Sequence, residues 1–189
     1  MYIAGKIAFI FLFFSFSISS SGLQDYSLPE ALRVLRAIKK AQSEQSKRNK
    51  DPIRKIVITE SELNSYTGYR IEKEKEKTMK EFRLKLFKEN KIEGKVMMDL
   101  RGQKIPKFLR PQMTIYFGGK LEVKNGMARF NIKDLFLGDQ RLKPKIIDII
   151  IRIATKTKST KAWSINDWHE LPYGIKDVKI NHREVIFYY

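Results

Sequence analysis

The stretch IVITESELNSYTGYR, Ile56 to Arg70, changes character in its middle and decides how the chain divides into elements. Its first residues are typical of a β-strand, and a polar run then begins. Thr59 followed three residues later by Glu62 is the capping-box pattern, in which each side chain accepts a backbone N–H of the other residue at a helix start. The stretch therefore predicts a strand that passes into a helix at Thr59, with Leu63 and Tyr66 on one helical face.

The same stretch also contains two closely spaced carboxylates, which could be a catalytic pair. Glu60 and Glu62 lie two residues apart, and this spacing on a helix points side chains in different directions. Negative charge in a first helical turn also suits the positive end of the helix dipole. Helix initiation thus explains both residues, and we favour it over catalysis.

Downstream of this stretch, alternating apolar and polar residues predict several antiparallel strands. Asn125-Gly126 is a strong hairpin signal because both turn positions tolerate a positive φ. Gly118-Gly119 in the middle of a strand predicts a bulge or a sharp bend. The expected inward-facing residues are Phe82, Leu84, Leu86, Ile92, Val96, Met98, Leu100, Met113, Ile115, Phe117, Leu121, Val123, Phe130 and Ile132.

The segment KPKIIDIIIRIATK, residues 143–156, predicts a helix that is apolar on nearly all sides. Pro144 suits a first helical turn, and Asp148 and Arg152 have the spacing of a helical ion pair. A helix with almost no polar face is expected to be buried. At about a dozen residues it is too short to cross a bilayer, which needs about 20.

The end of the chain, LPYGIKDVKINHREVIFYY, predicts a final hairpin with strands at 175–180 and 184–188 and a turn at Asn181-His182. Together, these signals predict an α+β fold. We expect one domain over residues 53–189, in which a strongly curved antiparallel sheet of five or more strands packs on a buried apolar helix. An N-terminal amphipathic helix would precede this domain.

That preceding helix is predicted within residues 23–52, where a basic amphipathic helix leads into a polar linker. Ser27 can cap its start, and Leu28, Leu32, Leu35 and Ile38 form a narrow apolar stripe. A basic amphipathic helix can lie on an anionic membrane, or it can pack on the domain through its stripe. The candidate membrane-surface residues are Arg33, Arg36, Lys39 and Lys40.

The first 22 residues, MYIAGKIAFIFLFFSFSISSSG, are typical of a secretory signal peptide. Lys6 supplies the positive n-region, an apolar run follows, and small residues suit cleavage near Ser21 or Gly22. An uncleaved N-terminal membrane anchor is the alternative. Either case predicts export, with the mature chain in the periplasm or outside the cell.

Composition indicates an attraction to polyanions. The 189 residues include 38 Lys and Arg against 21 Asp and Glu, a formal net charge of +17. Such an excess favours nucleic acid, anionic lipid or acidic glycan as a partner. The predicted export makes nucleic acid unlikely. The chain has no cysteine, which excludes disulfides, a thiol nucleophile and cysteine-ligated zinc.

No catalytic motif is recognisable in the sequence, and we expect no enzyme activity, no metal and no cofactor. His169 and His182 are the only histidines. The stretch NDWHE, residues 166–170, gathers acidic groups around His169 and resembles part of a metal site. A metal would need a further ligand from elsewhere, so a surface loop is the preferred interpretation.

Three stretches in this order resemble a group of exported bacterial envelope proteins related to the tubular lipid-binding, or TULIP-like, proteins. They are ITESELNSY, GGKLEVKNGMARFNIKDLFLGDQRLKP and LPYGIKDVKINHREVIFYY, and the resemblance covers residues 53–189. It implies a curved sheet wrapped on a helix, an apolar groove that holds lipid, and no catalytic residues. The high basic charge and the extra N-terminal helix depart from that pattern.

Two functions follow as hypotheses. In the first, the protein binds lipid or an anionic membrane surface through an apolar groove with a basic rim. The candidate lining residues are Met98, Phe117, Phe130, Ile146, Ile150 and Ile153. In the second, a solid-cored interaction module binds acidic envelope proteins or glycans through its basic surface.

Overall fold

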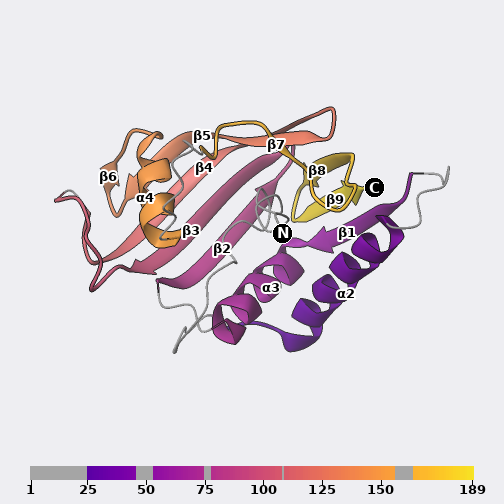
Figure 1. Cartoon of the computed structure of the whole chain (residues 1–189), viewed down its shortest axis with the longest axis horizontal. Helices are drawn as coiled ribbons and strands as arrows, with labels where there is room; N and C mark the ends of the chain where they lie inside the picture. The colour runs from indigo at the N-terminus through magenta and orange to yellow at the C-terminus, as the bar shows by residue number, and fades with distance from the viewer. Residues whose placement is uncertain (1–24, 46–52, 75–77, 108, 156–163) are drawn as a thin grey trace, which may run out of the picture.

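The computed structural model of the chain describes residues 25–45, 53–74, 78–107, 109–155 and 164–189 (Figure 1). The expected signal peptide, residues 1–22, and most of the polar linker lie outside this part of the chain. The described residues form an α+β fold that contains a six-stranded antiparallel sheet. The predicted fold class is therefore confirmed.

Two antiparallel sheets and three helices make up the described fold. Neighbouring strands of the large sheet follow the order β2-β3-β4-β5-β6, with β7 also beside β5, and the small sheet has the order β1-β9-β8. The large-sheet strands are β2 Met79–Phe87, β3 Lys91–Asp99, β4 Gln112–Lys124, β5 Met127–Leu137, β6 Gln140–Arg141 and β7 His169–Glu170. The remaining elements are β1 Lys55–Thr59, β8 Asp177–Asn181, β9 Glu184–Tyr188, α2 Leu28–Gln45, α3 Glu60–Lys73 and α4 Ile146–Thr155.

The predicted hairpin at Asn125-Gly126 is confirmed, because these residues have φ angles of 53° and 71° and join β4 to β5. The predicted irregularity at Gly118-Gly119 is also confirmed. Gly118 pairs with Asp134 while Gly119 pairs with Ile132, so β5 carries one extra residue at this point. A Cβ on Gly119 would lie 2.5 Å from the backbone oxygen of Asn131, which explains the need for glycine.

The last hairpin is present, but its turn differs from the prediction. Asn181 pairs with Glu184, so the turn lies at His182-Arg183, where Arg183 has a φ of 63°. The hairpin pairs through β9 with β1, the strand that opens the domain. The two ends of the domain are thus joined in one small sheet.

The inner face of the large sheet is covered in two halves. At one end, α4 packs on it through Ile147, Ile150 and Ile151 to form a first apolar core. At the other end, the small sheet, α3 and α2 cover it to form a second core. Leu84 and Ile92 contact both cores and connect them.

The helix predicted from the isoleucine run is confirmed as α4. The helix is not buried on all sides as expected: Ile149 is 37% exposed, whereas Ile150 is 2% exposed. The carboxylate of Asp148 accepts the backbone N–H of Ile165 at 3.0 Å, which fixes α4 to the chain that returns toward β7.

The predicted apolar stripe of α2 is confirmed for Leu35 and Ile38, which are partly buried against the second core, and is wrong for Leu28 and Leu32. Its fully buried residues are Ala31, Val34 and Ala41, whereas Leu28 and Leu32 are 49% and 38% exposed. Small side chains let two helices approach closely, and α2 packs mainly against α3. The helix is therefore rotated so that its smallest residues meet the domain.

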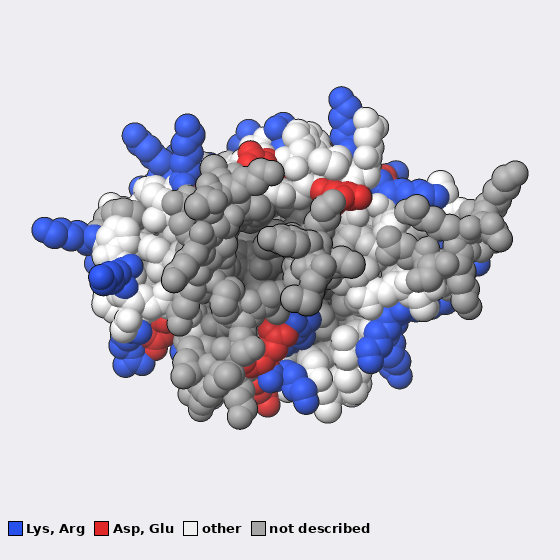
Figure 2. Space-filling view, in the orientation of Figure 1, with Lys and Arg blue, Asp and Glu red and all other residues white. Residues whose placement is uncertain are grey.

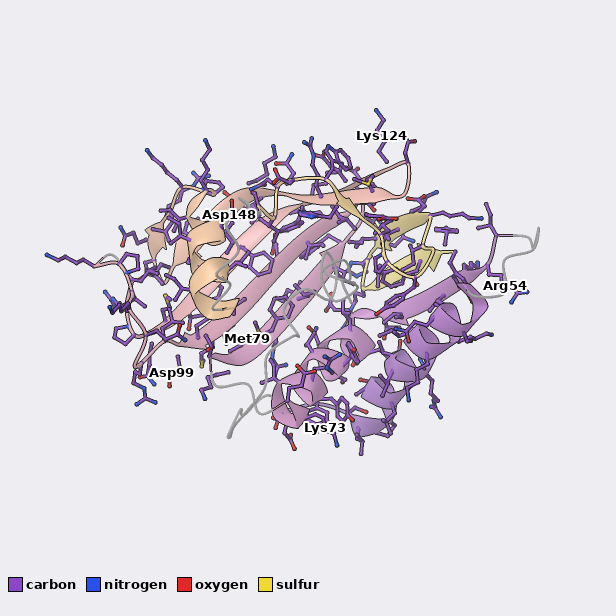
Figure 3. The ribbon with its side chains drawn as sticks, viewed as in Figure 1. Arg54, Lys73, Met79, Asp99, Lys124 and Asp148 are labelled. Atoms are coloured by element: carbon purple, nitrogen blue, oxygen red, sulfur yellow. The ribbon has the colours of Figure 1, made fainter. Side chains whose placement is uncertain are left out.

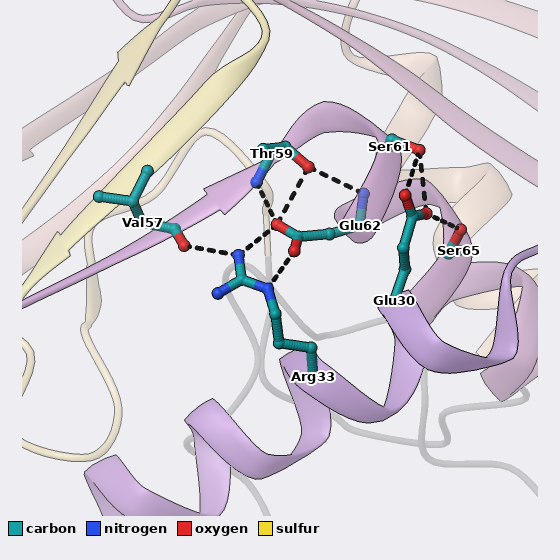
Figure 4. Close-up of polar contacts among 7 residues, drawn as sticks. All are labelled: Glu30, Arg33, Val57, Thr59, Ser61, Glu62 and Ser65. Carbon is teal, nitrogen blue, oxygen red and sulfur yellow. Dashed lines mark hydrogen bonds and ion pairs between the residues drawn. The ribbon is translucent and has the colours of Figure 1, made fainter.

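The capping box at the start of α3 is confirmed. Thr59 is the N-cap, its hydroxyl accepts the N–H of Glu62 at 3.2 Å, and the Glu62 carboxylate accepts the N–H of Thr59 at 2.8 Å (Figure 4). Glu62 is also paired with Arg33 of α2, which donates a further hydrogen bond to the carbonyl of Val57 at 3.0 Å. The Arg33 guanidinium lowers the pKa of Glu62.

A second polar side of α3 lies along β2, the edge strand of the large sheet. Asn64 donates to the carbonyl of Leu84 at 2.9 Å and accepts its N–H at 2.8 Å. Glu60 accepts the N–H of Leu86 at 2.6 Å, and Thr67 donates to the carbonyl of Phe82 at 3.1 Å. An exposed edge strand invites pairing with other chains, and α3 closes this edge with side chains.

We predict that Asn64→Leu lowers the free energy of unfolding by about 2 kcal/mol, because it leaves two backbone groups of Leu84 without their partner. Urea denaturation monitored by circular dichroism would measure the change. Asn181→Leu is the control. The side chain of Asn181 is exposed, and among the described residues it bonds to the side chain of Glu184 alone. Equal losses of unfolding free energy in the two variants would show that the contact of Asn64 with the edge strand does not stabilise the fold more than a surface contact does.

We also predict a pH dependence that passes through Glu62. Because folding lowers its pKa, Glu62 stabilises the fold above its unfolded pKa of about 4.3, and this contribution is lost as the pH falls through the folded value. Glu62→Gln should cost about 1–2 kcal/mol at pH 7 and progressively less in acid. Urea titrations at pH 7 and pH 3 would test this. A difference between the proteins that is constant with pH would contradict the assignment.

Candidate functional site

An apolar cavity lies between the inner face of the large sheet and α4. The cavity has a volume of about 30 Å³, which is room for about two water molecules. The lining side chains come from β2, β3, β4, β5, α4 and the segment before β7. They are Met79, Val96, Met98, Ile115, Phe117, Phe130, Ile132, Ile147, Ile150, Ile151 and Ile165.

The structure brings together four of the six residues predicted to line a groove: Met98, Phe117, Phe130 and Ile150. Ile146 and Ile153 do not line the cavity, although both are partly buried and pack against the same core. The difference follows from the rotation of α4, whose most buried side carries Ile147, Ile150 and Ile151.

Three aromatic rings shape the sheet side of the cavity region. Phe117 stacks on Phe82 with 6.2 Å between ring centroids and meets Phe130 edge-on at 5.9 Å. The ring of Phe117 also covers Gly94 on β3, where an added Cβ would lie 2.1 Å from the ring. Gly94 therefore gives Phe117 the space in which it lies flat against the sheet.

Basic residues gather at one end of the large sheet, where β3 ends, β4 begins and α4 starts. Arg101 pairs with Asp99 at 2.6 Å, and this contact lowers the pKa of the Asp99 carboxyl. Five further exposed cations at this end have no ion-pair partner among the described residues: Lys104, Lys107, Arg110, Lys143 and Lys145. Figure 2 shows Lys and Arg side chains projecting at this end of the molecule. In Figure 3, the label of Asp99 marks this end, and the label of Lys124 marks the opposite end.

The loops that carry these cations pack on the core that contains the cavity. Leu109 is buried in it, and Ile105 and Leu142 lie against it. Backbone hydrogen bonds hold the loops in place, from Leu100 to the carbonyl of Pro111 at 2.6 Å and from Leu142 to that of Leu135 at 2.8 Å. We call this group of five cations, Lys104, Lys107, Arg110, Lys143 and Lys145, the basic end.

The candidate membrane-surface residues of α2 fall into two kinds. Arg33 is engaged by the Glu62 carboxylate and by the carbonyl of Val57. Arg36, Lys39 and Lys40 are exposed on the side of α2 away from the domain. Within the described residues, none of the helices is both long and apolar enough for a membrane span.

The residues considered for acid–base or metal chemistry make structural contacts in the described fold. No three His, Asp or Glu side chains lie together in a way that could hold a metal ion in this part of the chain. His169 lies in β7 with its Nε2 at 2.8 Å from the carbonyl oxygen of Ser164. Glu60 and Glu62 are both used in structural hydrogen bonds.

The sequence analysis missed the basic end. A signal was present, since the segment RGQKIPKFLRP, residues 101–111, has four bases and no acid. Lys143 and Lys145 lie before α4, some 30 residues later, and only the pairing of β4 with β5 brings them to the same end of the sheet.

No protein-family model matches the chain, and the searches of curated proteins and of solved structures likewise found no match. We therefore infer a function from the geometry of the described residues.

We predict that Ile150→Ala lowers the free energy of unfolding by about 2–4 kcal/mol, because it removes a buried side chain that lines the cavity and so enlarges the empty space. The matched control is Ile149→Ala on the same helix, since Ile149 is partly exposed and should cost less than about 1 kcal/mol. Urea denaturation measures both. A loss at Ile150 no larger than that at Ile149 would mean that α4 does not pack tightly on the sheet.

Proposed function

We propose that this chain is a non-enzymatic, exported envelope protein that binds anionic lipid at a membrane surface. The observation that carries the proposal is the basic end, where five exposed cations without acidic partners in the described chain surround loops packed on an apolar core. Lys and Arg bind phosphate groups through charge-assisted hydrogen bonds. The partly buried apolar side chains of the same loops would contact the first carbons of the lipid tails.

The strength of such binding can be bounded. A basic residue near an anionic membrane contributes about 1 kcal/mol, so five contribute at most about 5 kcal/mol. That free energy corresponds to a dissociation constant on the order of 0.2 mM. Binding through the basic end is therefore expected to be reversible and to weaken as salt is added.

The size of the cavity favours head-group binding at the surface over carriage of a whole lipid. Space for about two water molecules does not admit an acyl chain unless α4 moves away from the sheet. In the proposal the sheet is strongly curved around α4 as its buried helix, and α2 is the amphipathic N-terminal helix. The register shift at Gly118-Gly119 and the burial of Ile150 support that arrangement, and so does the resemblance to TULIP-like proteins.

A second candidate is the solid-cored module that binds acidic proteins or glycans. The small cavity favours it, because an interior filled by side chains serves stability alone. The two candidates differ in the chemistry of the partner that the basic end would contact. A membrane offers anionic head groups beside an apolar layer, whereas a soluble polyanion offers charge only.

The experiment is cosedimentation of the purified protein with vesicles of phosphatidylglycerol or of phosphatidylcholine. We expect binding to the anionic vesicles only, and we expect Lys104→Gln/Lys107→Gln/Arg110→Gln to weaken it at least tenfold. The matched control is Lys55→Gln/Lys88→Gln/Lys176→Gln, which removes the same charge from exposed positions away from the basic end. It should weaken binding less than threefold.

Two outcomes would contradict the proposal. Equal losses in the two triple variants would mean that net charge alone attracts the protein to vesicles. Binding of soluble poly-glutamate as strong as binding of anionic vesicles would favour the interaction module. Extraction of the purified protein with organic solvent, followed by mass spectrometry, would show whether any lipid occupies the interior.

A further inference from the structure

The outward face of the large sheet carries a row of side chains that crosses five strands in register. Arg83 of β2 pairs with Lys95 of β3, Lys95 with Tyr116 of β4, Tyr116 with Phe136 of β5, and Phe136 with Arg141 of β6. Neighbouring strands lie about 4.8 Å apart, so the row is about 19 Å long. The row consists of two cations, two aromatic rings and a third cation.

Tyr116 is the exposed aromatic residue of this row, and Phe136 is half-buried. Tyr116 is 45% exposed, and the neighbouring Met97 is 40% exposed. Neither apolar core contains Met97, Tyr116 or Phe136, because both cores are built from residues of the opposite face. The alternation of burial along β4 places Tyr116 on the outward side, and its exposure is large for an aromatic residue on an ordered strand.

The charges on this face of the sheet are mixed and mostly paired. Glu81 lies 2.8 Å from both Arg83 and Lys95, and Glu122 lies 2.7 Å from Arg129. The amide of Asn131 also donates to Glu122 at 2.7 Å. The face thus presents carboxylates, an amide and cations that are bonded to one another.

Unpaired cations add a positive excess along β4. Lys120 and Lys124 are exposed, share the outward side with Tyr116, and have no ion-pair partner among the described residues. Lys85 on β2 is also exposed and has no ion-pair partner among the described residues. A ligand of moderate negative charge would therefore be attracted to this face.

We propose that this outward face binds an extended acidic polysaccharide. The faces of Tyr116 and Phe136 carry the negative side of the aromatic quadrupole, against which the C–H bonds of a sugar ring can lie. The carboxylates and amide between the cations suit a chain rich in hydroxyl groups, and Lys120 and Lys124 suit its scattered acidic groups. A row that crosses five strands on an outward face suits an extended polymer, since sites for small molecules are concave.

The mixed charge also separates this ligand from nucleic acid. A nucleic acid carries a charge on every nucleotide and is bound by neutralising many phosphates. Glu81 on β2 and Glu122 on β4 would repel such a chain, although the aromatic rings could stack on bases. This inference does not depend on lipid binding at the basic end.

The test is a binding titration of the full chain with polygalacturonate, and with poly-glutamate and single-stranded DNA as comparison polymers. We expect polygalacturonate to bind best. Tyr116→Ala should weaken that binding about tenfold, as expected for the loss of one stacking platform, and Tyr116→Phe should restore it. Lys120→Gln/Lys124→Gln should weaken the binding and reduce its dependence on salt. Tyr116 is exposed, so circular dichroism should show that its variants remain folded.

The Lys104→Gln/Lys107→Gln/Arg110→Gln variant keeps this face intact and should bind polygalacturonate within about twofold of the unchanged protein. That result would distinguish the two surfaces, since the same variant should lose vesicle binding. Equal binding of poly-glutamate, or no effect of Tyr116→Ala, would overturn the proposal in favour of simple charge attraction. Preferred binding of DNA that Tyr116→Ala weakens would overturn it in favour of a nucleic-acid partner.

Discussion

The described fold is organised around the first turn of α3, where four elements meet within a few residues. Thr59 ends β1 and caps the helix, and Glu62 closes the cap and engages Arg33 of α2. Glu60 accepts the N–H of Leu86 on β2 and donates its own N–H to the carbonyl of Arg183 in the last hairpin. Arg183 in turn donates to the carbonyl of Leu86 at 3.0 Å. Because buried or edge backbone groups must find partners, this corner fixes the small sheet against the edge of the large one.

This constraint explains which faces of the large sheet are covered and which surfaces stay exposed. Once α3 and the small sheet cover one half of the inner face, only the other half needs α4. The loops around the start of α4 then carry few structural ion pairs, and their cations stay exposed. The outward face supports no core at all, so its residues can be exposed, aromatic or charged without loss of packing.

Local signals in the sequence predicted the elements well, and long-range pairings were not predictable from them. The capping box at Thr59 and the turn at Asn125-Gly126 depend on residues a few positions apart, so a short stretch contains all the relevant chemistry. The pairing of β1 with β9 joins residues more than 120 positions apart. The rotation of α2 depended on the shape of α3, because hydrophobicity favours Leu32 as a packing residue while close helix contact favours Ala31 and Val34.

The candidate sites follow the same division. Alternation along the strands correctly indicated that Met98, Phe117 and Phe130 share an inner face, since a strand fixes the side of each residue. The basic end is a property of two loops, and loops have no period from which their neighbours could be read.

What separates the two proposed surfaces physically is the placement of acids. Acids sit among the bases on the outward face, where they lower charge density and add acceptors, whereas the basic end leaves five cations unpaired in the described chain. Unpaired charge suits densely anionic head groups, and paired charge beside aromatic rings suits a hydroxyl-rich polymer.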